Sequence, residues 1–203
     1  MEKNIQSWSR GSWSRIGAVL GVAALSLGGL SAVRPASGGS STSSFIDFRL
    51  RAREAIEDLT YCYAEATDLI GAGQLEAGRA MYVNECFAPN ALIEASFPGN
   101  DPNGPPDLTS GPSQWADIAN NVFTTNGYVA TQHLNSNVRI DIHGTTATMT
   151  TYLNAVHVID PDGSIDLANG TYTDEVVLTP QGWRISKRSL RLITFMRIES
   201  PTP

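Results

Sequence analysis

The chain has 203 residues, and its 20 acidic against 14 basic side chains give it a formal charge of −6. The basic residues are scattered except near the C-terminal end, where Lys187 and Arg188 are expected to be solvated, so the composition argues against a nucleic-acid partner. No repeat has a solenoid period, and about 160 residues can bury a stable core, so one folded domain with appendages is expected.

Residues 1–43 have the pattern of a secretory signal peptide and a linker. Basic residues precede an apolar run, 16–33, which ends in a small, polar stretch. This run is interrupted by serine and glycine and is short for a membrane span. Cleavage is expected between about residues 32 and 41, which predicts a secreted or periplasmic single domain over 44–203 with no stable membrane span. An uncleaved amino-terminal anchor is the alternative.

Two helices are expected at the start of this domain. Apolar residues recur at spacings of three and four over 45–70 and again over 74–86. Gly71 and Gly73 separate the two segments, because glycine commonly ends a helix.

Cys62 and Cys86 are the only cysteines, one in each of these helices. An exported protein meets an oxidising compartment, where such a pair can form a disulfide. Two buried thiols are the favoured interpretation, because a free cysteine behaves as a small hydrophobe. A disulfide stays open as the alternative.

A short strand, a long loop and a third helix are expected next. Residues 91–97 have strand character, and 98–112 are dense in Gly, Pro, Asn and Asp and are predicted to form a loop at the rim. Ser113 can cap the helix that follows, which is expected to end at Asn126.

Four long strands complete the domain. Turn residues separate the apolar segments 128–142, 147–159, 165–178 and 183–198. Tight turns between long neighbours predict an antiparallel meander, since parallel pairing would need long crossovers. Helices followed by a meander indicate an α+β domain, in which the sheet curls around the helices and leaves a mouth for a small ligand.

Four segments carry a resemblance to a known superfamily: AIEDLTYCYAEATD (55–68), WADIANNVF (115–123), TQHLNSNVRI (131–140) and GTYTDEVVLTPQGWRISKRSLR (170–191). They resemble the nuclear transport factor 2-like superfamily, within it the group of scytalone dehydratase, hexachlorocyclohexane dehydrochlorinase, bile-acid dehydratase and SnoaL-like polyketide cyclases. This resemblance spans nearly the whole mature chain. It implies a cone-shaped, curved, mixed but mostly antiparallel sheet wrapped around N-terminal helices. Because the fold hosts many activities, it does not settle the reaction.

The same resemblance implies a catalytic site. Asp68 matches the family aspartate that orients a catalytic histidine, and His133 in TQHL matches that histidine. Tyr63 matches a tyrosine of the bile-acid dehydratase, and His157 looks like the second histidine of scytalone dehydratase. Arg191 resembles a strand arginine of the bile-acid enzyme when a one-residue gap is allowed. Tyr63, His157 or Arg191 would then donate a proton or hydrogen bond to the substrate.

The pocket wall is expected to contain several aromatic residues. Tyr63 lies five residues before Asp68, about 140° around an ideal helix, so both can border a pocket without sharing one stripe. A core role explains Tyr63 equally well. Pocket residues of scytalone dehydratase fall near Ala95 and Gly170 here, so its substrate does not transfer. The predicted substrate-binding residues are Tyr172, Phe97, Trp115 and Tyr152.

These residues predict a cofactor-free lyase that eliminates water or another leaving group from a small, largely apolar cyclic compound. Its base would be His133, oriented by Asp68. The alternatives are a ketosteroid-isomerase-like isomerase, a polyketide cyclase, or a non-catalytic domain that binds a hydrophobic ligand or a partner protein. Metal is not expected, because His133 and His157 lack a third ligand at the usual spacing. A nucleotide cofactor is not expected either, because no Gly-rich turn joins a strand to a helix.

A homodimer or homotrimer is also expected. The convex face of the long sheet would leave an apolar surface if nothing covered it. The residues assigned to that face are Val138, Ile140, Val156, Val158, Val176 and Leu178.

Overall fold

The computed structural model describes residues 40–101, 104–159 and 163–200. The predicted signal peptide and linker (1–43) therefore lie outside the described residues, except for residues 40–43, which belong to the first helix. Two helices precede a six-stranded sheet, a third helix follows its first two strands, and the last four strands pair consecutively and antiparallel. The predicted α+β class is confirmed. None of the described helices is both long and apolar enough to cross a membrane.

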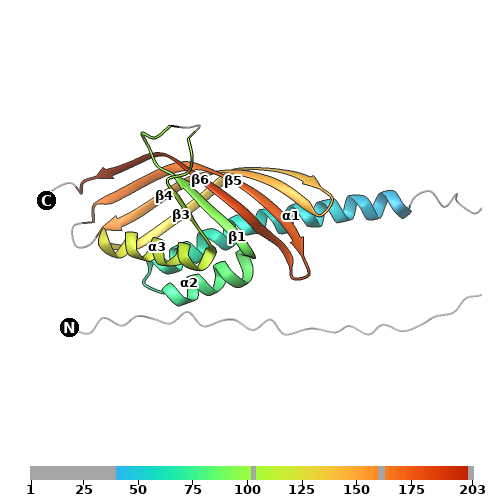
Figure 1. The fold of residues 1–203 in the computed structure, drawn as a ribbon, viewed down its shortest axis with the longest axis horizontal. Coiled ribbons are helices and arrows are strands. Elements are labelled where there is room, and N and C mark those ends of the chain that lie inside the picture. Colours follow the sequence, from blue (N-terminus) through green and yellow to red (C-terminus); the bar gives the residue numbers. More distant parts are fainter. Residues whose placement is uncertain (1–39, 102–103, 160–162, 201–203) are drawn as a thin grey trace, which may run out of the picture. The chain divides into compact units, whose positions relative to one another are not determined.

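Helices α1 to α3 all lie on one face of the sheet, and α1 (Ser40–Gly71) is the longest of them (Figure 1). The apolar stripe of α1 is buried, including Ile56 and Ile70, whereas residues 44–51 are exposed. The helix ends at Gly71, where an added Cβ would overlap the side chain of Thr131. Glycine is therefore required at this position, because the strand that carries Thr131 approaches the end of the helix closely.

Helix α2 (Leu75–Met81) continues into the π-helical turn η1 (Tyr82–Cys86). This turn lies against α1 and brings Cys62 and Cys86 to a Cα–Cα distance of 5.7 Å, where they form a disulfide. The interpretation as two buried thiols is therefore wrong. The two cysteines lie on packed elements at a separation that suits a bridge.

Strand β1 (Phe87–Ser96) begins earlier than predicted, directly after the disulfide. Strand β2 (Leu108–Ser110) lies in the segment predicted as loop and pairs with β1. Helix α3 (Pro112–Thr125) has Gly111 as its N-cap, so the predicted cap Ser113 is wrong. Ser113 lies inside the first turn and accepts hydrogen bonds from Arg79 instead.

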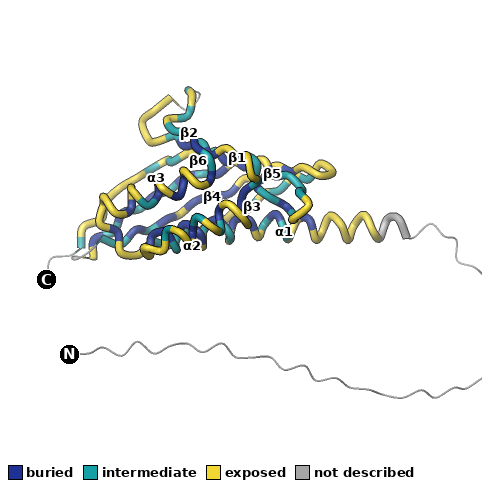
Figure 2. Tube along the Cα trace, turned by 60° about the horizontal axis from the view of Figure 1, so that its bottom comes forward, coloured by how far each residue is buried: buried dark blue, intermediate teal, exposed yellow. Residues whose placement is uncertain are grey.

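The long strands are β3 (Tyr128–His143), β4 (Thr146–Ile159), β5 (Ile165–Thr179) and β6 (Gly182–Ile198). Their antiparallel meander is confirmed. The sheet order is β2-β1-β6-β5-β4-β3, and β1 runs parallel to β6. Figure 2 shows buried residues alternating along these strands where the sheet faces the helices.

Irregularities in the strands change which side chains face inward. In β3 the register shifts between Ser136 and Arg139, and Asn137 adopts a φ of 54°. This bulge turns the following residues over, so Val138 and Ile140 pack against the core, as do Val176 and Leu178 on β5. The predicted apolar convex face is therefore wrong for these four residues.

Arg188 also faces inward and is fully buried, so its predicted solvation is wrong. Its neighbour Lys187 is partly exposed and lies 3.0 Å from Glu94. The two residues point to opposite faces because successive side chains alternate along a strand.

Candidate active site

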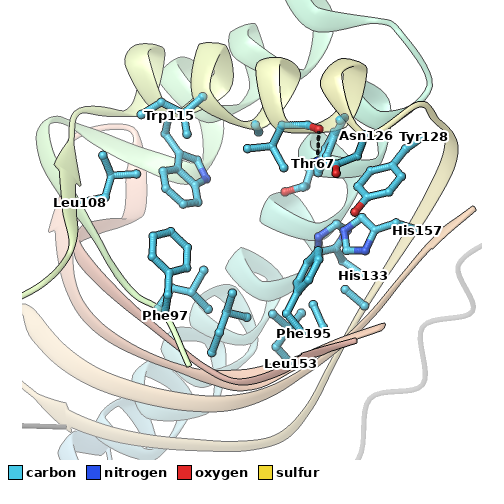
Figure 3. Close-up of a pocket in the computed structure, with 18 of the residues that line it drawn as sticks. Thr67, Phe97, Leu108, Trp115, Asn126, Tyr128, His133, Leu153, His157 and Phe195 are labelled. Atoms are coloured by element: carbon cyan, nitrogen blue, oxygen red, sulfur yellow. Dashed lines mark hydrogen bonds between the residues drawn. The ribbon is translucent and has the colours of Figure 1, made fainter. Parts of the chain in front are cut away.

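A cavity of about 420 Å³ lies between the inner face of the sheet and helices α1 and α3 (Figure 3). Most of its wall is aliphatic or aromatic. None of the described residues that line it is Asp, Glu, Lys or Arg. Its polar groups come from a few side chains: Tyr63, Thr67, Trp115, Asn126, Tyr128, His133, His157 and Tyr172.

The end of α1 is fixed against β3 at two points that flank His133. Asn135 donates a hydrogen bond to the backbone oxygen of Thr60 (2.9 Å), and Thr131 donates to the Asp68 carboxylate (2.8 Å). Because both bonds join the same helix and strand, they fix the register between them. These two hydrogen bonds position the Asp68 side chain next to His133.

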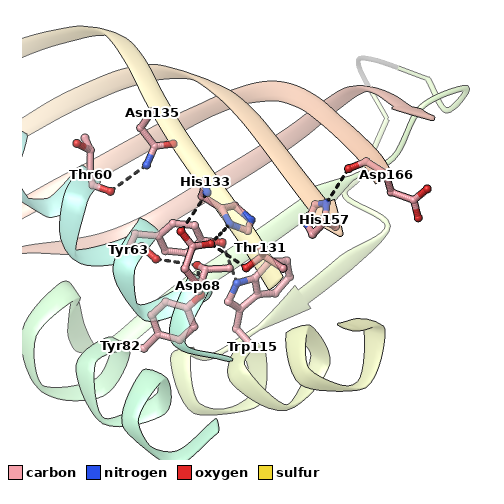
Figure 4. Close-up of polar contacts among 11 residues, drawn as sticks. Thr60, Tyr63, Asp68, Tyr82, Trp115, Thr131, His133, Asn135, His157 and Asp166 are labelled. Atoms are coloured by element: carbon pink, nitrogen blue, oxygen red, sulfur yellow. Dashed lines mark hydrogen bonds and ion pairs between the residues drawn. The ribbon is translucent and has the colours of Figure 1, made fainter. Parts of the chain in front are cut away.

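Asp68 and His133 form the predicted pair (Figure 4). Nδ1 of His133 lies 2.7 Å from Oδ1 of Asp68, and the backbone N–H of His133 donates to Oδ2 at 3.1 Å. Burial raises the pKa of Asp68, but the hydrogen bonds and charge of His133 outweigh burial and hold this pKa below its ordinary value. The ionised carboxylate can only accept, so Nδ1 carries the proton. In the neutral ring this tautomer leaves Nε2 without a proton, and because His133 lines the cavity, Nε2 can then accept a proton from a ligand.

His157 lies on β4, next to His133 in the cavity wall. The two ring centroids are 5.4 Å apart and nearly perpendicular. Nδ1 of His157 donates to the backbone oxygen of Asp166 at 3.2 Å. Burial and the nearby His133 lower the pKa of His157 to about 4. The ring is thus neutral near neutral pH with its one N–H already used, which argues against the expected role of His157 as a donor.

Three side chains next to His157 hold its ring in place: Tyr128, Asp166 and Arg197. Tyr128 stacks on the ring with a centroid distance of 4.8 Å and donates to the carboxylate of Asp166 at 2.6 Å. Arg197 binds the same carboxylate through Nε and Nη2 and lowers the pKa of Asp166. Sequence reasoning missed Tyr128 and Asp166, although Asp166 is the cross-strand partner of His157.

Tyr63 lies in the cavity wall and is almost fully buried. Its hydroxyl accepts a hydrogen bond from Nε1 of Trp115 at 3.0 Å. Its ring lies 5.3 Å from that of Tyr172, at an interplanar angle of 68°. The expected wall residues Trp115, Tyr172 and Phe97 all line the cavity.

Tyr152 and Arg191 are not brought to the cavity. Both are exposed and neither is among its lining residues. Arg191 lies between Leu190 and Leu192, which do line the cavity, so strand alternation directs the arginine to the opposite face. Their predicted site roles find no support in this geometry.

The described residues contain no cluster of three or more His, Cys, Asp or Glu side chains suited to a metal ion. What the cavity does hold is one oriented base in an apolar wall. This combination suits proton abstraction from a bound, uncharged compound.

The helices and curved sheet, with a cavity between them, place the protein in the nuclear transport factor 2-like class. Residues 49–189 match the model of the SnoaL-like domain, and the chain belongs to this family. No curated protein is significantly similar to the chain in sequence.

Solved structures share the fold at low sequence identity. Hexachlorocyclohexane dehydrochlorinase LinA-type3 from Novosphingobium barchaimii is 20% identical with a TM-score of 0.56, covering 76% of this chain and 97% of that one. A candidate scytalone dehydratase from Novosphingobium aromaticivorans is 22% identical with a TM-score of 0.56, covering 78% and 93%. An NTF2-like protein with a cystatin-like fold from the same species is 20% identical with a TM-score of 0.55, covering 77% and 92%.

Proposed function

We propose that the protein is a cofactor-free lyase that eliminates water or another leaving group from a small, uncharged, largely apolar cyclic compound. The observation that carries this proposal is the Asp68–His133 pair, whose imidazole lines an apolar cavity. A non-catalytic binding domain has no need for a carboxylate that orients a histidine.

In the proposed reaction, Nε2 of His133 removes a proton from the carbon next to the one that bears the leaving group. The electron pair of that C–H bond forms the new double bond, and the leaving group departs with its own electron pair. Asp68 fixes the tautomer of His133 and stabilises the imidazolium that forms. Each general acid–base step of this kind contributes about 10² to 10⁴-fold.

The group that donates to the departing atom is best assigned to Tyr63. Arg191 lies on the outer face, and the N–H of His157 is held by a backbone carbonyl. Tyr63 accepts its hydrogen bond from Trp115, so its own proton is available to another acceptor.

The wall also restricts the ligand. A charged ligand would lose its hydration without meeting a formal opposite charge among the described lining residues, which is costly. Thermal shift with matched pairs, such as 2-naphthol and 2-naphthoate, is expected to show stabilisation by the neutral member only. Equal stabilisation by the carboxylate would contradict this part of the proposal.

The experiment that tests the reaction is a screen of neutral cyclic alcohols, halides and ketones, with product analysis. Elimination yields an alkene and a released leaving group, whereas an isomerase returns a product of unchanged mass. For a compound that turns over, His133→Ala should reduce turnover by at least about a hundredfold while the protein stays folded. Near-native turnover by folded His133→Ala would exclude the pair as the catalytic base.

We also propose that the domain works outside the cytoplasm. The amino-terminal pattern of basic and apolar residues supports this location. The disulfide between Cys62 and Cys86 supports it independently, since such bonds persist in oxidising compartments.

A homo-oligomer is proposed through the outer face of the sheet. Exposed large apolar patches mark interaction sites. In light scattering at micromolar concentration we expect a dimer or trimer, and a monomer alone would contradict the proposal. The apolar residues at one end of this face include Leu134, Val156, Val158, Met196 and Ile198.

A further inference from the structure

Beneath the cavity lies a buried ion pair that the proposed reaction has not used. Arg188 donates from Nε to Oδ1 of Asp174 at 2.8 Å and from Nη2 to Oδ2 at 2.7 Å. Both side chains are fully buried. The guanidinium carbon lies 4.0 Å from the ring centroid of Tyr63 and 4.2 Å from that of Tyr172. Arg188 therefore packs against the rings of two tyrosines that line the cavity.

Stability alone is a weak reason for this arrangement. A buried ion pair contributes little more than apolar side chains of similar volume, because desolvation offsets the attraction. Nη1 of Arg188 is also buried without a hydrogen-bond partner among the described residues. The planar group instead packs on aromatic rings, where a desolvated cation–π contact is favourable.

The charges in this cluster are well defined. Burial opposes the charge of Arg188, but Asp174 outweighs burial and raises the pKa of Arg188, so the guanidinium stays charged. Burial and the neighbouring Tyr63 raise the pKa of Tyr172 and of Tyr82 well above their ordinary value. These two phenols therefore keep their protons.

We propose that Arg188, held by Asp174, is a positioning residue for Tyr63: it fixes the phenol against Trp115 and compensates the negative charge that develops on the Tyr63 oxygen. This inference rests on the proposed elimination, in which the Tyr63 proton moves to the departing group and leaves a phenolate. Water is largely excluded at this depth, so protein groups must stabilise the phenolate charge. The Trp115 N–H does so through its hydrogen bond to the Tyr63 oxygen, and the Arg188 guanidinium does so from the face of the Tyr63 ring.

The test removes the pair without leaving one charge unpaired. The double variant Arg188→Met, Asp174→Leu replaces both partners with apolar side chains and is expected to fold. The indole ¹H–¹⁵N signal of Trp115, assigned with Trp115→Phe, reports its hydrogen bond to Tyr63 without any ligand. Tyr63→Phe should move this signal, and the double variant should move it in the same direction by at least half as much.

A matched control comes from the same strand. Lys187→Met with Glu94→Gln removes an ion pair from the opposite face, and the Trp115 signal should then stay in place. A folded double variant with the Trp115 signal at its wild-type position would overturn the proposal. If the double variant does not fold, Arg188→Lys serves instead, because it keeps the charge but loses the planar group that packs on the two rings. An unmoved Trp115 signal in Arg188→Lys would overturn the proposal equally.

Turnover separates this inference from the function on which it rests. With a substrate in hand, the double variant should lower kcat at least tenfold and change KM less than threefold. Adding Tyr63→Phe should cause little further loss, because both changes act on one donor. If the Trp115 signal moves as expected but no neutral cyclic compound reacts, the elimination fails while the positioning of Tyr63 stands.

Discussion

Replacing Asp68 with asparagine should block the base without removing it. The carboxylate accepts hydrogen bonds from Thr131, from the backbone N–H of His133 and from Nδ1 of His133. An amide has one oxygen, so one of its two orientations sets the new NH₂ against the backbone N–H. That clash leaves buried donors unpaired and costs about 1–3 kcal/mol, which favours the other orientation about 5- to 150-fold.

In the favoured orientation the NH₂ faces Nδ1 of His133, and Nδ1 must then become an acceptor. The ring proton moves to Nε2, which faces the cavity, so turnover should fall by about 10² to 10⁴-fold. Long-range ¹H–¹⁵N NMR of the imidazoles distinguishes the two tautomers. The His157 signals serve as the control, since that ring is held by the backbone of Asp166. Persistence of the Nδ1–H tautomer of His133 in Asp68→Asn would refute the reasoning.

Three further predictions concern stability and processing. Reducing the Cys62–Cys86 bond, whose partners are 24 residues apart, should lower the free energy of unfolding in urea by about 3.5 kcal/mol, and reductant should not affect the double serine variant. His157 has a folded pKa of about 4 against about 6.5 when unfolded, so the unfolded chain gains a proton first and stability should fall by up to about 3 kcal/mol from pH 6.5 to pH 4. His157→Gln should flatten that slope in thermal unfolding, and an unchanged slope would assign it to other groups. Mass spectrometry of protein from its native host should find a chain that starts between residues 33 and 42, whereas an intact Met1 would contradict cleavage.

The long strands could be predicted from the sequence because each carries its own local signal. The bounds of β4 and β5 lie within one residue of the predicted segments. The short strand β2 could not be predicted, because its three residues have no period of their own and depend on pairing with β1. The disulfide was left open for the same reason, since it depends on how two helical segments pack.

The site residues could be predicted where they belong to a motif. The prediction failed where it depended on which face of a strand a side chain points to. The resemblance identified Asp68 and His133, which the structure brings together. It assigned an arginine role to Arg191, whereas the inward-facing arginine is Arg188, three positions earlier. Register shifts between β5 and β6, each with an extra residue on β6, decide which β6 residues face inward, and nothing in the local sequence places them.

The two histidines of the cavity show why residue type alone does not define a role. His133 and His157 lie on neighbouring strands, but one Nδ1 meets a carboxylate and the other a backbone carbonyl. A carboxylate compensates the charge of an imidazolium, whereas a carbonyl does not offset the cost of burial. The charge of His133 is a further cause of the low pKa of His157. The pair is therefore divided into a base that can accept a proton and a neutral wall residue beside it. This division is set by the carboxylate of Asp68, 65 residues before His133 in the sequence, and by the backbone oxygen of Asp166, nine residues after His157.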